Sequence, residues 1–169
     1  MIYFFSFWIF VSILLSPKAP EKDLMALNFK YTQSGKMYFH NIRSFYYTRD
    51  TYRGFQRYQL KKLEKTDVPL NFVLLENLAS EEFFIAPVID SNWLHSEVFI
   101  ASDTVFELLN SNRDYMHTLA AHIFLALENG EDVRLRNRAG ETWSMQEDVY
   151  IRKGIETVLF DYFRWKQLR

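Results

Sequence analysis

The first seventeen residues of the chain carry no charged side chain, and most of them are large apolar or aromatic groups. From Lys18 onward charged and apolar residues are mixed, and no later apolar run is longer than a few residues. This contrast predicts one hydrophobic N-terminal segment attached to one water-facing domain. The expected parts are the hydrophobic segment 1–17, a tether over 18–35 and a single domain over 36–169.

The hydrophobic segment fits a membrane anchor better than a cleaved signal. As a helix, residues 2–17 are roughly 24 Å long, slightly shorter than the ~30 Å hydrocarbon core of a bilayer, so they span best with local thinning or beside other protein. A secretory signal needs a basic n-region and small residues before its cleavage site. No Lys or Arg precedes the apolar stretch, and the small residue Ala19 is directly followed by Pro20. A retained anchor is therefore expected, and a cleaved signal is the alternative.

Flanking charge predicts the side of the membrane on which the domain lies. Four lysines follow the apolar stretch within about 20 residues, and basic side chains near a span are held in the cytoplasm: Lys18, Lys22, Lys30 and Lys36. This favours a cytoplasmic domain. Glu21 and Asp23 lie among these lysines, so a periplasmic domain is the alternative. The chain has no cysteine, which excludes disulfides and thiolate metal sites and fits either compartment.

Alternating and β-branched or aromatic positions predict strands in the first part of the domain. Met37–Thr48 and Thr51–Leu63 are rich in Tyr and Phe, with a turn expected at residues 48–50. Three further strands are expected at Leu70–Glu76, Phe83–Ile89 and Glu97–Ala101. Pro87 cannot donate a ladder hydrogen bond, so its strand is expected at an edge of the sheet or to end there. The pattern predicts an antiparallel meander.

Helical periodicity dominates afterwards. A short helix is expected at Asp103–Leu109, and a longer one runs from an Asn112 cap to the Asn129-Gly130 stop. A brief strand over 132–137 separates it from a final helix, for which Ser144 and Glu147 form a predicted capping box. The apolar stripe of this last helix is Ile151, Ile155, Val158, Leu159 and Tyr162.

The predicted fold class is therefore α+β. We expect an antiparallel sheet of about five to six strands, followed by two to three helices packed on one face, and preceded by an N-terminal hydrophobic membrane helix.

No stretch of the sequence carries a motif for catalysis, for a metal or for a cofactor. His117 and His122 are five residues apart, roughly 140° around a helix, which does not suit ligands of one zinc ion. The five glycines form no phosphate-binding loop. Clustered carboxylates around residues 76–82 and 128–132 are most simply solvated loop charge. We expect no cofactor and no metal site, and the lack of such motifs favours a binding protein over an enzyme.

Charge is unevenly distributed along the chain although its net value is -1. Residues 30–65 have nine basic and two acidic side chains, whereas residues 66–128 have one and ten. Such asymmetry indicates either complementary parts of one domain or faces that meet charged partners. Internal complementarity is the simpler interpretation.

The basic stretch also contains the most promising candidate surface. Its aromatic residues alternate with Arg43, Arg49, Arg53 and Arg57, a mixture that can bind anionic headgroups or, less favourably beside a membrane anchor, nucleic acid. The alternative is that the aromatic side chains face the core and the arginines face water. In the later strand, Arg134 and Arg136 share one face. The candidate interaction face thus consists of Arg43, Arg49, Arg53, Arg57, Arg134 and Arg136.

Three functions remain open. The favoured one is a non-enzymatic, membrane-anchored accessory or scaffold subunit, whose domain docks onto other membrane-protein subunits and contacts anionic lipid. The second is an exported periplasmic binding or interaction domain behind a cleaved signal. The third is a membrane-tethered hydrolase that uses Glu81, Glu82 or His95, which requires a pocket that holds these groups together.

Overall fold

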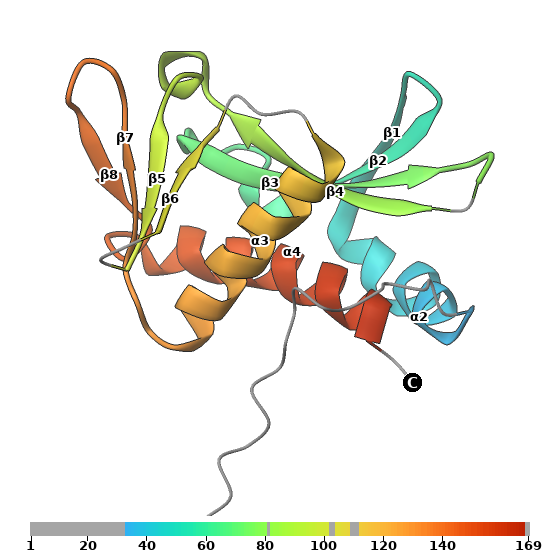
Figure 1. Cartoon of the computed structure of the whole chain (residues 1–169). Coiled ribbons are helices and arrows are strands. Elements are labelled where there is room, and N and C mark those ends of the chain that lie inside the picture. The colour runs from blue at the N-terminus through green and yellow to red at the C-terminus, as the bar shows by residue number, and fades with distance from the viewer. Residues whose placement is uncertain (1–32, 81, 102–103, 109–111, 168–169) are drawn as a thin grey trace, which may run out of the picture.

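The computed structural model describes residues 33–80, 82–101, 104–108 and 112–167 (Figure 1). The predicted hydrophobic segment 1–17 and nearly all of the predicted tether lie outside these residues. Among the helices that the structure does describe, none is both long and apolar enough to cross a bilayer.

Two four-stranded antiparallel sheets make up the strand content of the described chain. The first sheet has the order β1-β2-β3-β4, with strands Tyr47–Tyr52, Phe55–Leu60, Leu70–Asn77 and Phe83–Ile89. The second has the order β6-β5-β7-β8, where β5 is Glu97–Ile100, β6 is Thr104–Glu107, β7 is Val133–Arg136 and β8 is Thr142–Ser144. The α+β class is confirmed, whereas the prediction of one continuous sheet is wrong.

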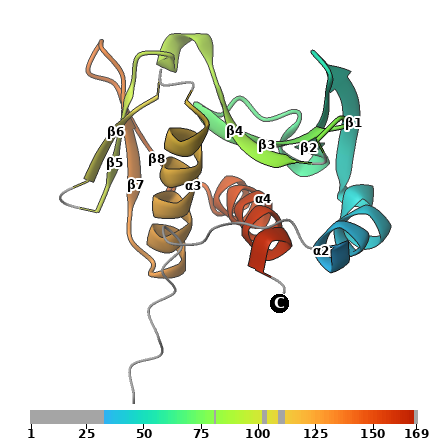
Figure 2. The same cartoon turned by 45° about the vertical axis from the view of Figure 1, so that its right-hand side comes forward.

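Helices fill the space between the two sheets. In Figure 2, α3 (Arg113–Glu128) lies against the second sheet, and α4 (Val149–Gln167) runs beneath the first. The short helix α2 (Gln33–Tyr38) lies at one end of the molecule beside the C-terminal half of α4. Single turns of tighter or wider helix complete the structure: η1 (Phe39–Arg43), η2 (Ser44–Tyr46), η3 (Lys61–Leu63) and η4 (Ser91–Trp93).

Several local predictions are confirmed. Strand β4 has the predicted bounds and lies at an edge of its sheet, as Pro87 requires. The Asn112 side chain caps α3, because its carbonyl oxygen accepts the backbone N–H groups of Asp114 (2.8 Å) and Tyr115 (3.4 Å). In the second strand, Tyr58 and Leu60 are buried while Arg57 faces outward.

The predicted first strand, Met37–Thr48, is wrong over most of its length. Residues 33–46 are helical instead, and β1 begins at Tyr47. The turn lies at Arg53-Gly54 rather than at residues 48–50, with φ angles of 50° and 86°. Two positive φ angles suit the twist of a two-residue hairpin, and Gly adopts them without a steric penalty.

Two further predictions need correction. The expected helix at 103–109 contains strand β6, in which Phe106 points inward while Val105 and Glu107 are exposed, the alternation of a half-buried strand. The Ser144–Glu147 capping box is also wrong, because Ser144 ends β8 and α4 begins only at Val149. The Asp148 carboxylate caps that helix by accepting the N–H groups of Tyr150 (2.8 Å) and Ile151 (3.1 Å).

A single hydrophobic cluster connects both sheets with the helices. Its members include Leu74 and Ile85 from the first sheet and Val98 and Leu135 from the second. The stripe predicted for the final helix lies inside this cluster, with Ile155, Val158 and Leu159 fully buried.

Candidate interaction surfaces

Residues 33–46 form one helical segment, named here the α2–η2 segment, whose inner side is held in an aromatic cage. Phe39 is buried with its ring centroid 5.4 Å from that of Tyr47, 5.2 Å from Tyr58 and 5.8 Å from Phe83. The backbone around Phe39 is a π-helical turn, in which the Ser44 N–H donates to the Phe39 carbonyl. Such wide turns are rare and occur frequently at functional sites.

A buried carboxylate on β3 binds the beginning of this segment. Glu76 accepts a hydrogen bond of 2.8 Å from the Tyr58 hydroxyl, and its other oxygen lies 3.3 Å from His40 Nε2. Lys36 Nζ lies 4.0 Å from that same oxygen. A buried carboxylate is tolerated only with such partners, so these contacts attach the beginning of the segment to β3.

A second buried carboxylate, Asp161 on α4, binds the end of the segment. Arg43 donates to both of its oxygens, at 2.8 and 2.9 Å, and the Tyr47 hydroxyl donates at 2.7 Å. Burial raises the pKa of the Tyr47 phenol well above its ordinary value, and the charge of Asp161 raises it further. Burial alone lowers the pKa of Arg43, but its hydrogen bonds to Asp161 and the charge there raise it by more. Both side chains therefore keep their protons near neutral pH.

The outer side of the α2–η2 segment is apolar and exposed. The exposed fractions are 57% for Met37, 52% for Ile42, 72% for Phe45 and 57% for Tyr46. Scattered exposed apolar residues are common, but four within ten consecutive positions are a local concentration of the kind that marks interaction surfaces. We call these four side chains the apolar patch.

The six candidate arginines do not share one face. Arg43 is partly buried and bound to Asp161. Arg57 binds Asp50 across the β1–β2 hairpin, while Arg49 and Arg53 are exposed on it. Arg134 and Arg136 are exposed on strand β7 of the other sheet.

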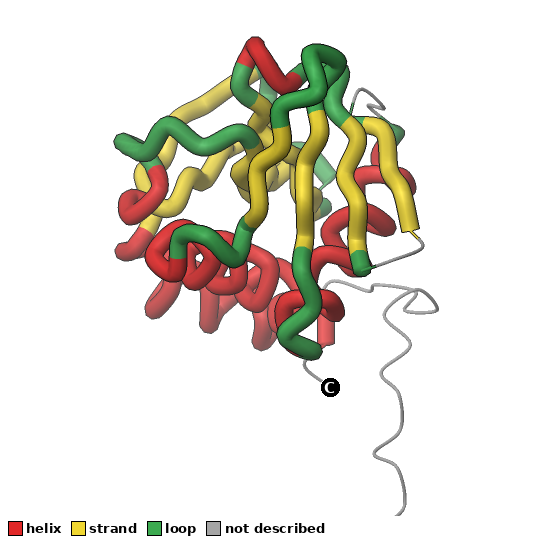
Figure 3. Tube along the Cα trace, turned by 90° about the vertical axis from the view of Figure 1, so that its left-hand side faces the viewer, coloured by secondary structure: helices red, strands yellow, loops and turns green. Residues whose placement is uncertain are grey.

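The outer face of the second sheet is not covered by a helix anywhere in the described chain, as Figure 3 shows. Arg136 binds Glu97 (2.8 Å) and stacks on the Phe99 ring, 4.6 Å from its centroid. Arg134 binds Asp132, whose pKa is shifted downward: burial raises it, and hydrogen bonds from Ser144 and Arg134 lower it by more. A hollow of about 520 Å³ on this face is lined by Phe99, Ala101, Asp132, Arg134, Leu135, Arg136 and Thr142. We call this surface the open sheet face.

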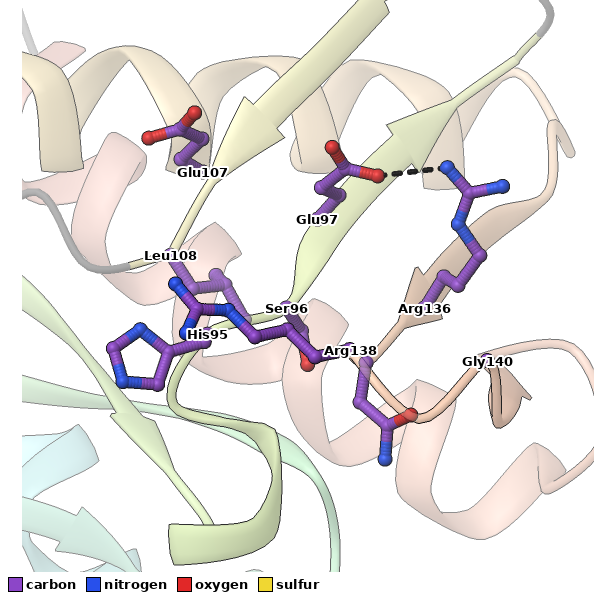
Figure 4. A pocket seen from close by; sticks show the side chains of 9 residues that line it. His95, Ser96, Glu97, Glu107, Leu108, Arg136, Arg138 and Gly140 are labelled. Carbon is purple, nitrogen blue, oxygen red and sulfur yellow. Dashed lines mark hydrogen bonds and ion pairs between the residues drawn. The ribbon is translucent and has the colours of Figure 1, made fainter.

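A polar pocket of about 560 Å³ lies at one end of the same sheet (Figure 4). It is lined by His95, Ser96, Glu97, Glu107, Leu108, Arg136, Asn137, Arg138 and Gly140. The Ser96 hydroxyl is buried and has no hydrogen-bond partner among the described residues. A serine nucleophile needs a base within hydrogen-bond reach, so the pocket does not present an activated serine.

The proposed hydrolase residues are not brought together where the structure describes them. Glu82 lies 3.5 Å from Arg113 and precedes β4, whereas His95 follows the other end of that strand. A strand of seven residues is roughly 23 Å long. Glu81 lies outside the described residues. The described ranges also contain no group of three or more side chains that could hold a metal ion.

Sequence reasoning missed Glu76 and Asp161 as the carboxylates that position the α2–η2 segment. Each carried a detectable signal. Glu76 directly follows the apolar run of β3 and is still buried, and Asp161 lies within the apolar stripe of α4, between the buried residues Leu159 and Tyr162. A charged residue on a buried face requires a partner, although the identity of that partner was not encoded locally.

Comparison with protein-family models, curated proteins and solved structures finds no match for this chain. Its function is therefore inferred from its own residues.

Proposed function

We propose that this protein is a non-enzymatic accessory subunit, anchored in a membrane by residues 1–17, whose domain docks onto a membrane-protein complex. The observation that carries the proposal is the open sheet face, with its hollow beside Phe99 and two flanking arginines. Aromatic and arginine side chains are enriched at protein interfaces and supply much of their binding energy.

The charge of the open sheet face favours a protein partner. Arg134 and Arg136 are balanced by Asp132 and Glu97, and Glu107 lies on the neighbouring strand β6. Phosphate-rich partners require an unbalanced positive surface. A face with paired charges around an apolar hollow suits a protein surface of mixed polarity, and it gives specificity through charge placement.

Site-specific cross-linking in native membranes tests this proposal. A photoreactive residue at Val105 or Thr142, both exposed on the second sheet, should cross-link to one membrane subunit. The same residue at Leu78, which is exposed on the β3–β4 turn, should not.

Charge reversal supplies the second arm of the test. The double variant Arg134→Glu/Arg136→Glu should abolish that cross-link and lower co-purification of the same subunit by roughly tenfold or more. Lys65→Glu/Lys153→Glu changes the charge equally at exposed positions elsewhere and should leave both unchanged. Equal cross-linking from Leu78, or a cross-link that survives the arginine reversal, would refute docking through this face.

The fate of the N-terminal segment separates this proposal from an exported domain. Intact mass of the native protein should include residues 1–18, and extraction should need detergent. A mature chain that begins between residues 18 and 24 would instead indicate the exported periplasmic alternative.

A further inference from the structure

We propose that the apolar patch of the α2–η2 segment lies in the headgroup layer of an anionic bilayer and fixes the domain against the membrane in one orientation. This surface and its partner differ from the open sheet face and its protein partner. The two proposals share only the expectation that residues 1–17 are in the membrane.

The patch has the composition of an interfacial helix. Amphipathic helices that lie in a bilayer surface bury aliphatic and aromatic side chains at the boundary of headgroups and acyl chains. Met37, Ile42 and Phe45 supply such side chains, and Tyr46 has the amphipathic ring that is enriched at this depth. Phe39 and Arg43 occupy the inward side of the same segment. Met37, Ile42 and Phe45 are exposed, and Tyr46 lies at the border of the two sides, because the Arg43 guanidinium is 5.0 Å from its ring centroid.

Basic side chains are concentrated in the part of the chain that contains the patch, and one of them lies at its edge. Of the seven basic residues in 33–63, Arg43 and Arg57 bind carboxylates and Lys36 lies 4.0 Å from Glu76, so the positive excess rests on the other four: Arg49, Arg53, Lys61 and Lys62. Arg49 and Arg53 are exposed on the adjoining hairpin, and Lys61 Nζ donates to the Phe45 carbonyl at 2.8 Å, which places a cation at the edge of the patch. Anionic headgroups attract such clusters next to a membrane segment. The balanced open sheet face has no comparable excess.

The patch lies close in sequence to the expected membrane anchor. Residues 18–32 separate the expected anchor from Gln33, and an extended chain of this length reaches no more than roughly 50 Å. The patch starts four residues later, at Met37. A tether this short keeps the patch at a high effective concentration near the bilayer, so even a modest affinity for lipid suffices.

Because the inner side of the segment is attached to the domain, lipid binding by the patch would fix the orientation of the whole domain. Phe39, His40 and Arg43 connect the segment to β2, β3 and α4 through the aromatic cage and the two buried carboxylates. A segment attached at both ends to the domain cannot bind lipid without carrying the domain with it.

Fluorescence in lipid nanodiscs tests the proposal with the full chain. Because the protein has no cysteine, single cysteines can replace Ile42 or Phe45 and be labelled with an environment-sensitive dye. Leu78 and Val105 are apolar positions outside the patch that are also more than half exposed, and they serve as controls. Each nanodisc holds one chain and no other protein, in phosphatidylcholine alone or in equal parts of phosphatidylcholine and phosphatidylglycerol.

In the anionic nanodiscs, dyes at positions 42 and 45 should emit at shorter wavelength and be quenched by nitroxide-labelled lipids several-fold more strongly than dyes at the controls. Quenching should fall in phosphatidylcholine alone and at high salt. Arg49→Glu/Lys61→Glu should lower the ratio of docked to undocked protein by roughly tenfold or more, whereas Arg134→Glu/Arg136→Glu on the other sheet should not.

Quenching at position 45 that equals quenching at the controls in both lipids would refute the proposal. A dye at position 45 that is shielded from water in native membranes but not in nanodiscs would also refute the proposal, because the patch would then bind protein rather than lipid. Since the nanodiscs contain no partner subunit, failure of docking through the open sheet face leaves this result unchanged.

Discussion

At the level of single residues, Asp161 decides how the α2–η2 segment is attached to the domain. A buried carboxylate costs free energy unless it is paired and hydrogen-bonded. Here Arg43 supplies the charge and two hydrogen bonds, and Tyr47 supplies a third. Loss of any one donor leaves a partly unsatisfied charge in a dry environment.

Tyr47→Phe should lower the free energy of unfolding by about 1.5–3 kcal/mol, because it removes a buried hydrogen bond to a charged group. Tyr52→Phe alters an exposed tyrosine on the same strand and should change stability little. Chemical denaturation measures both. If Tyr47→Phe changes the free energy of unfolding as little as Tyr52→Phe does, the Tyr47 hydrogen bond contributes nothing to stability.

The raised pKa of Tyr47 also predicts how the free energy of unfolding changes above neutral pH, with and without the Tyr47 hydroxyl. An unfolded tyrosine loses its proton near pH 10, whereas folded Tyr47 retains it. The unfolded state then binds fewer protons, so the stability that Tyr47 contributes is complete below about pH 10 and is lost as pH rises further. Tyr47→Phe should therefore flatten the decline, while Tyr162, whose pKa is also raised, leaves some of it.

At the level of secondary-structure elements, local pattern predicted those parts whose folding is decided locally. The caps and apolar spacing of α3 and the apolar run of β3 are readable in a short window, and both elements occur as expected. The outward positions of Arg134 and Arg136 also follow from alternation alone.

The segment at 37–48 was mispredicted because long-range contacts decide its structure. Its aromatic composition favours a strand. Phe39, however, is packed against Tyr58 and Phe83, and Arg43 binds a carboxylate 118 residues away. Contacts of this separation are invisible to periodicity, and so was the buried position of Arg43 among the candidate arginines.

Close packing of α4 against η3 yields a prediction at this scale. A Cβ added to Gly154 would lie 2.6 Å from a methyl carbon of buried Leu63. Gly154→Ala should therefore destabilise the protein by about 1–3 kcal/mol through overpacking, which exceeds the gain of up to about 1 kcal/mol in helix propensity.

Lys153→Ala, at the preceding exposed position of the same helix, is the control and should be nearly neutral. Urea denaturation of both variants decides the matter. A stabilised Gly154→Ala variant would mean that Leu63 moves aside at no cost.

At the level of the whole molecule, one hydrophobic cluster joins the two sheets through α3 and α4. Neither sheet buries its inner face without these helices. We expect the described residues to unfold cooperatively, as small domains with a shared core usually do.

Leu159→Ala should test this cooperativity, since Leu159 is fully buried in α4. Truncation should cost about 2–5 kcal/mol. Dyes on single cysteines at Thr51 in the first sheet and at Thr142 in the second should report the same midpoint, and the variant should shift both equally. Two separate midpoints would show that the sheets unfold independently.

The separation of Arg43 and Asp161 in the sequence determines when their ion pair can form during synthesis of the chain. The ribosome adds the aspartate 118 residues after the arginine, which takes roughly 6–24 s at usual rates of synthesis. Glu76, only 36 residues after His40, is available much earlier. The start of the α2–η2 segment can thus be attached while translation continues, whereas its end must wait for α4. Throughout that interval the newly made Arg43 lacks its native counter-ion, and α4, the last of the described helices, completes the attachment of the segment that contains α2, the first of them.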